Sequence, residues 1–245
     1  VDINGDGKLE IVIRGSYSQL NPQVLVLING IPITNVFIGD RSQAWGGMPV
    51  NSIKRIEIIR GPGSALYGAD AFAGVINIVT KTAQDIPGTE IGLGFGSFST
   101  GEAWLLHGGK WGGMDAAVSV EVGKTGGFRN TVNADAQTAF DALLGSNASQ
   151  APGPVETGRD HVDLRLDLSV AKWRFRTGYQ GRRNVGTGVG AAQALDPRGK
   201  SESDRFNADL TYTTQDLAKN WEVQAQASFF DVTTKSDLFL FPNKS

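Results

Sequence analysis

Strict alternation of apolar and polar positions fills much of the chain from Pro87 onward. In the clearest segment, HVDLRLDLSV (161–170), valines and leucines alternate with Asp163, Arg165, Asp167 and Ser169. A period of two predicts a β-strand with one apolar and one polar face. Such segments predict seven strands, near 89–96, 102–111, 115–122, 161–170, 173–182, 205–213 and 221–229, the last running on toward Leu238.

Alternation alone does not say which face is inside, but the connections between the predicted strands do. Short turns are expected near Gly112-Gly113, near Ala171-Lys172 and over 216–220, and long connections over 126–160 and 185–204. Outer-membrane barrels have short periplasmic turns and long extracellular loops. The pattern therefore favours a transmembrane barrel over a soluble sandwich.

Aromatic residues also gather at two levels along these strands. One group lies at the strand ends beside the short turns, and a second group lies six to eight residues further along: Trp111, Trp173, Tyr212 and Trp221, then Tyr179, Phe206 and Phe229. Aromatic girdles of this kind mark the two membrane interfaces. Because an open sheet would leave unpaired backbone groups in lipid, we expect the chain to be part of a longer protein.

Residues 1–86 follow a different pattern and predict a small mixed α+β domain, with the barrel strands in 87–245. VLVLING (24–30) runs into an Asn-Gly hairpin signal followed by IPI, and IKRIEIIR (53–60) and GVINIVTK (74–81) read as two further strands. Between them, SALYG (64–68) is expected to form one helical turn.

Composition narrows the function classes. The 245 residues include 32 glycines and no cysteine, and the absence of cysteine excludes a disulfide scaffold and thiolate metal sites. The net charge of -2 does not favour a nucleic-acid partner. No stretch approaches the ~18 apolar residues of a membrane helix. No nucleophile–base pairing is apparent, and His107 and His161 stand singly on strands, so we expect no enzyme.

The opening segment VDINGDGKLE spaces Asp2, Asn4 and Asp6 as a calcium loop spaces its first three ligands. Position 12 of such a loop falls on Ile13, which offers no side-chain oxygen, and no second copy of the segment occurs. We interpret it as a polar turn before a strand. A calcium-binding adhesion or propeller-type module is the alternative that this segment alone would support.

The segment NSIKRIEIIRGPGSALYGADAFAGVINIVTK (51–81) resembles the plug domain of TonB-dependent outer-membrane receptors. The upstream segments IVIRG (11–15) and VLVLINGIPI (24–33) match further family segments in the same order. Residues of the plug motif that match are Arg55, Glu57, Arg60, Gly61, Pro62, Ser64, Tyr67, Gly68, Gly74 and Asn77. Among them, Gly61, Gly68 and Gly74 are expected to allow turns and close packing, because glycine adopts backbone conformations that other residues avoid.

The resemblance implies a mainly β fold in the bacterial outer membrane. A plug sits inside a 22-stranded antiparallel barrel, of which this chain would hold only the first strands. It implies a receptor that imports a scarce extracellular solute with energy delivered by TonB and its inner-membrane complex. The expected ligand is a ferric siderophore, with haem, cobalamin or an oligosaccharide as alternatives.

Partners and cofactors follow from the same resemblance. TonB, a small-molecule ligand and outer-membrane lipid are the expected partners, with no nucleic acid. No resident cofactor is expected, although the transported ligand can carry iron. A passive outer-membrane porin is the alternative, and it would not need a plug.

The resemblance also nominates site residues. Arg14 and Arg60 match plug arginines that pair with barrel glutamates in the family, here expected beyond Ser245. The arginine fork suits such a contact because it binds a carboxylate through two hydrogen bonds. Candidates for substrate contact lie in two segments that match the apical plug loops: Gln19, Asn21, Phe37, Arg41 and Trp45. Ordinary loop packing is the alternative for each.

Overall fold

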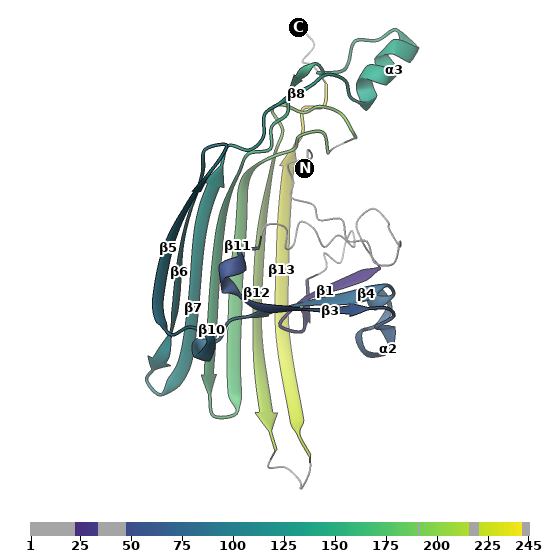
Figure 1. Ribbon diagram of the computed structural model, residues 1–245. Coiled ribbons are helices and arrows are strands. Elements are labelled where there is room, and N and C mark those ends of the chain that lie inside the picture. The colour runs from purple at the N-terminus through teal and green to yellow at the C-terminus, as the bar shows by residue number, and fades with distance from the viewer. Residues whose placement is uncertain (1–22, 34–47, 191, 216–220, 242–245) are drawn as a thin grey trace.

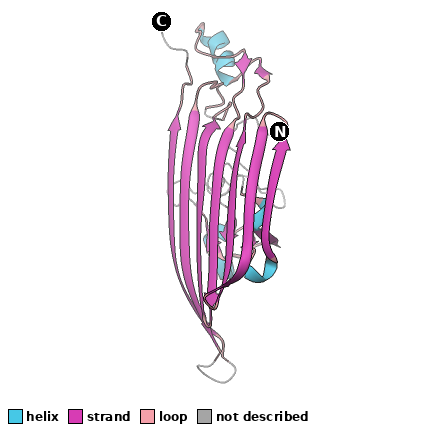
Figure 2. Cartoon of the chain, turned by 90° about the vertical axis from the view of Figure 1, so that its left-hand side faces the viewer, coloured by secondary structure: helices cyan, strands magenta, loops and turns pink. Residues whose placement is uncertain are grey.

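The fold is mainly β, and the strands of its two larger sheets run across one another (Figure 1). A third sheet in the described residues has two short strands. The computed structural model describes residues 23–33, 48–190, 192–215 and 221–241. We call the seven-stranded sheet the wall, and the four-stranded sheet with its short helices the plug. Figure 2 shows the plug behind the wall when the wall faces the viewer.

The wall is an antiparallel meander in the order β13-β12-β11-β10-β7-β6-β5. All seven predicted strands are present. They are β5 (Gly88–Gly96), β6 (Thr100–Trp111), β7 (Met114–Thr125), β10 (Arg159–Val170), β11 (Trp173–Gly186), β12 (Lys200–Thr214) and β13 (Val223–Asp237).

The plug sheet has the order β2-β1-β4-β3. Its strands are β1 (Val24–Ile28), β2 (Ile31–Pro32), β3 (Ile53–Arg60) and β4 (Gly74–Thr80), and β1 runs parallel to β4. Short helices η1 (Val50–Ser52), α2 (Ser64–Tyr67), η2 (Ala69–Ala71) and η3 (Ala83–Asp85) lie between and after the strands. The helical turn at SALYG is confirmed, as is the hairpin, whose Asn29 and Gly30 both have positive φ.

The core of the plug lies around β1, whose five residues are all buried. Val26, Ile28, Ile33 and Ile78 form one cluster, and Phe230 of β13 packs against it. A continuous apolar run is what a strand covered on both faces requires. The wall therefore contributes directly to the plug core.

The wall is polar toward the plug and apolar outward, as the alternation predicted for a barrel. On β10, Asp163 and Asp167 are 2% and 9% exposed, whereas Leu164 between them is 41% exposed. A soluble sandwich would show the reverse. Hydrophobic side chains on the outer face are thus exposed and have no covering layer among the described residues, as expected of a surface that meets lipid.

The two ends of the wall differ as predicted. Gly112-Gly113 and Ala171-Lys172 make tight turns at one end. The connection over 126–158 lies at the other end and contains β8 (Thr131–Val132), α3 (Ala136–Leu144) and β9 (Gly153–Pro154) (Figure 1). Within the described ranges, none of the helices is both long and apolar enough to cross a membrane.

The outer face also carries the two predicted aromatic groups. The rings of Trp173 and Tyr212 lie 4.8 Å apart near the short-turn end, and those of Phe206 and Phe229 lie 6.2 Å apart further along. The predicted connection over 185–204 was too long. β11 continues to Gly186 and β12 begins at Lys200, because a bulge between Arg182 and Val185, with Asn184 at φ 54°, interrupts the alternation.

The segment that joins plug to wall packs on the inner face of β6 and β7. Ile86 is buried against Leu106 and Ala117, just after η3. Gly108 of β6 allows this approach, since a Cβ there would lie 2.3 Å from the carbonyl oxygen of Ile86 and 2.8 Å from that of Ala83. Both contacts are to backbone, which cannot rotate away as a side chain could.

Replacement of Gly108 by alanine should therefore displace the joining segment from the wall. We expect Gly108→Ala to lower the free energy of unfolding of the complete protein by about 1–3 kcal/mol, the usual cost of overpacking. Denaturant unfolding would measure it. Gly101→Ala on the same strand is the matched control, because its nearest neighbour would lie 3.9 Å away. Equal midpoints for the two variants would contradict the close-approach role.

Candidate functional site between the plug and the wall

Several predicted site residues lie outside the described residues. They are Arg14 of the proposed lock, the substrate-contact candidates Gln19, Asn21, Phe37, Arg41 and Trp45, and the opening residues Asp2, Asn4 and Asp6. Their roles remain predictions. The described part of the site consists of the plug motif, the inner face of the wall and the loops at the long-loop end.

Three residues of the plug motif form one hydrogen-bonded group across the plug sheet. Arg55 Nε and Asn77 Nδ2 each donate to Glu57 at 2.8 Å, and Gly30 N donates to Asn77 Oδ1 at 3.0 Å. The amide of Asn77 and then the guanidinium of Arg55 hold the pKa of Glu57 below its ordinary value. This group ties β3, β4 and the β1–β2 turn together.

The glycine-rich part of the motif builds a compact turn between β3 and β4. Gly61 and Gly68 have φ of 129° and 82°, values that residues other than glycine rarely adopt. Pro62, Ser64 and Tyr67 lie between them, and Ser64 and Tyr67 are the ends of α2, which Gly68 closes by donating to Ser64 O at 3.0 Å. Gly74 then starts β4 opposite Arg60.

Arg60 ends β3, the edge strand of the plug sheet, and is exposed. No ion pair joins it to any residue in the described ranges. Ile56, Ile58 and Ile59 on the same strand are exposed as well. Among the described strands β3 is the edge of its sheet, so these apolar side chains lie at an exposed edge.

A wall glutamate contacts the plug through a residue that the sequence analysis did not single out. Asn51 Nδ2 of η1 donates to Glu121 Oε2 of β7 at 3.1 Å. On the other side of Glu121, His161 Nε2 of β10 lies 3.5 Å from Oε1. Gly123 makes room for the imidazole, since a Cβ there would lie 2.3 Å from its Cε1 atom.

A second contact holds the joining segment to the plug. Lys54 Nζ lies 2.6 Å from Asp85 Oδ1, while Thr82 donates to Asp85 Oδ2 from its backbone at 2.9 Å and from its hydroxyl at 2.7 Å. Burial raises the pKa of Asp85, but these donors outweigh it and bring the pKa down to about 2. Asp85 is therefore ionised at neutral pH and fixes the end of η3.

The inner face of the wall carries ion pairs that span neighbouring strands. They are Arg174–Asp167 at 2.5 Å, Arg176–Asp209 at 2.6 Å and Arg182–Asp163 at 2.8 Å, and Arg205 donates to Gln180 at 2.7 Å. These pairs were not predicted from the sequence. The opposite charges at matching polar positions of adjacent strands were the available signal.

The long-loop end is held together by two aspartates that sequence analysis did not single out. Asp135 caps α3 by accepting from Thr138 N and also accepts from Leu195 N of the next loop, both at 2.7 Å. The Ser146 hydroxyl and the N–H groups of Ser149 and Ala148 lower the pKa of Asp141 to about 2. The helix itself was not predicted, although Asp135 and Gly145 are ordinary signals for its two ends.

Comparison with known proteins finds similarity over part of the chain. Residues 1–75 match the family model of the TonB-dependent receptor plug domain. The chain is 42% identical over 93 residues to the vitamin B12 transporter BtuB of Vibrio vulnificus strain CMCP6, a match that covers 38% of this chain and 14% of the relative.

Solved structures share the fold at lower identity. The FrpB iron transporter of Neisseria meningitidis aligns with a TM-score of 0.61 and 17% identity, over 87% of this chain and 32% of that one. The siderophore receptor PirA of Pseudomonas aeruginosa aligns with a TM-score of 0.58 and 19% identity, over 92% of this chain and 35% of that one. The chain thus spans about a third of the length of these solved proteins.

Asp85 makes the attachment of the joining segment dependent on pH. The pKa of Asp85 in the folded protein is lowered to about 2. Its contribution to the free energy of unfolding is therefore fully present above the unfolded pKa of about 4 and is lost as the pH falls toward 2. We expect Asp85→Asn to destabilise the complete protein by about 2 kcal/mol at most at pH 7, and the difference from wild type to shrink between about pH 4 and pH 2.

Denaturant midpoints measured across this pH range would test the prediction. Asp115→Asn is the matched control, because Asp115 pairs with the mostly exposed Lys110, and exposed pairs contribute about 0–1 kcal/mol. A difference between wild type and Asp85→Asn that stays constant down to pH 2 would rule out the carboxylate as its source.

Proposed function

We propose that this chain, which carries a TonB-dependent receptor plug domain and strands of the barrel around it, takes part in energised import of a small extracellular solute. The single observation that carries the proposal is the plug seated on the polar face of the wall. Asn51 bonds Glu121, and Ile86 is buried against Leu106. A passive porin would leave that face open to water.

The cellular location and partners in this proposal follow from the family. The wall lies in the bacterial outer membrane, with its apolar face against lipid and α3 at the extracellular end. TonB pairs with a segment on the periplasmic side by strand addition and delivers the energy. The protein catalyses no reaction on the solute; its role is binding and passage.

The ligand we propose first is a ferric siderophore. Siderophore and iron receptors are among the solved relatives, but these relatives share only the fold at below 20% identity. Cobalamin is the second candidate, because the 42% identical relative is a vitamin B12 transporter. Gln19, Asn21, Phe37, Arg41 and Trp45 are the proposed contacts on the plug.

Uptake by the complete receptor tests the proposal. We expect cells that lack their own receptors for the probes but express this one to accumulate labelled ferric siderophore under iron limitation, and accumulation to cease when TonB is deleted. Labelled cobalamin, measured in parallel, separates the two ligands. Uptake that continues at the same rate without TonB would contradict energised import and would support the porin alternative.

Arg60 provides a test at residue level. If it pairs with a carboxylate of the complete barrel, Arg60→Ala should impair uptake and speed hydrogen exchange of β3 and β4 by about 5- to 30-fold, equivalent to about 1–2 kcal/mol. Lys110→Ala is the control, since Lys110 forms an exposed pair with Asp115 on the wall and lies outside the plug. Wild-type uptake together with unchanged exchange protection would remove Arg60 from the proposed lock.

A further inference from the structure

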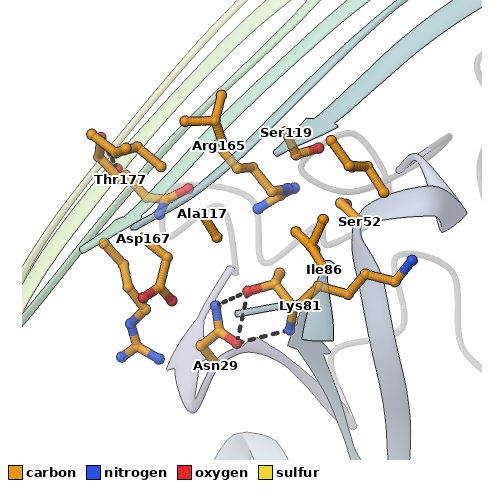
Figure 3. Close-up of a pocket in the computed structure, with 15 residues that line it drawn as sticks. Asn29, Ser52, Lys81, Ile86, Ala117, Ser119, Arg165, Asp167 and Thr177 are labelled. Atoms are coloured by element: carbon orange, nitrogen blue, oxygen red, sulfur yellow. Dashed lines mark hydrogen bonds between the residues drawn. The ribbon is translucent and has the colours of Figure 1, made fainter. Parts of the chain in front are cut away.

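A small cavity lies between the plug and the wall, close to the middle of β10 (Figure 3). Its volume is about 30 Å³. Residues of the plug and of five wall strands line it, among them Ser52, Lys81, Ile86, Leu106, Ser119 and Arg165. A space of this size accepts one or two water-sized species and is too small for a tetrahedral oxyanion such as phosphate.

Arg165 of β10 points into this cavity (Figure 3). Its Nε and Nη2 atoms are buried, and neither finds an acceptor among the described residues. The side chain passes over Gly178 of β11, the residue directly opposite it, where a Cβ would lie 3.5 Å from Nη1. The wall thus makes room for a guanidinium without supplying a carboxylate for it.

The nearby aspartates of the wall are engaged by other residues. Asp167 is held by Arg174 through three hydrogen bonds between 2.5 and 3.1 Å. Asp163 accepts from Gln180 at 2.6 Å and from Arg182 at 2.8 Å. Asp163 attracts Arg165 through space and Arg182 repels it, but neither carboxylate reaches the two free nitrogens.

The charges that line the cavity are unequal. Lys81, Arg165 and Arg176 contribute three positive charges, and Asp167 contributes one negative charge. Arg176 is itself paired with Asp209 outside the lining. A buried cation without a partner is strongly unfavourable, because desolvation is not offset by an opposite charge. An anion in the cavity would provide this opposite charge, whereas a neutral water molecule would stabilise the buried guanidinium only weakly.

We propose that the cavity binds a small monovalent inorganic anion of the size of chloride, held by Nε and Nη2 of Arg165. The anion would lie between β10 and the plug, so it would connect the two parts of the molecule by charge. The proposal does not depend on which solute the receptor imports.

Anomalous diffraction from crystals of the complete receptor soaked in bromide tests the site directly. We expect a bromide peak within hydrogen-bonding distance of Arg165 Nε and Nη2 in wild type, and no peak in Arg165→Gln. Arg174→Gln is the matched control, because its partner is Asp167, and the peak should persist there. Water or a protein carboxylate at that position in wild type would overturn the proposal, as would a peak that remains in Arg165→Gln.

A solution measurement tests whether the anion contributes to stability. At constant ionic strength, replacing a large organic anion with chloride should raise the unfolding midpoint of the wild-type receptor by about 1–3 °C. Arg165→Gln should show no such response, and Arg174→Gln should retain it. A wild-type midpoint that is equal in the two salts would count against the site even if Arg165→Gln does not fold.

Discussion

The orientation of the wall, polar face inward, is the constraint on which the rest of the structure depends. Charged side chains such as Asp163 and Arg182 are buried on the inner face, and they are stable there only because each finds a partner across the strands. The plug completes this arrangement by covering the face. An apolar inner face would have packed as an ordinary core and left no room for polar contacts such as that between Asn51 and Glu121.

In the described part of the chain, the contacts between plug and wall are chemically mixed. Ile86 and Phe230 contribute apolar packing from the joining segment and from β13, respectively, while Asn51 contributes a single hydrogen bond. Such an interface can hold a plug in place and still release it in steps, because no single large apolar surface must be exposed at once.

Sequence patterns predicted the elements of this fold better than its contacts. Period-two alternation located all seven wall strands, because each strand has an apolar outer face and a polar face toward the plug. The bulge after Arg182 hid the continuation of β11, since one extra residue reverses the alternation. The partner of Arg176 depends on strand register: its carboxylate, Asp209, is 33 residues away in sequence. Most of the predicted contact residues lie outside the described residues, and the interface residue Glu121 was not predicted.

The parallel pairing of β1 with β4 has a mechanical consequence. β1 is approached from the segment before Val24, whereas β4 continues through η3 into the wall after Thr80, so the two attachments lie at opposite ends of the pair. Tension applied between them loads the backbone hydrogen bonds of Val24 through Ile28 in shear, all at the same time. Strands loaded in shear resist far more force than strands peeled apart one bond at a time. A force applied to the chain before β1 would therefore be transmitted to the wall before β1 separates from β4.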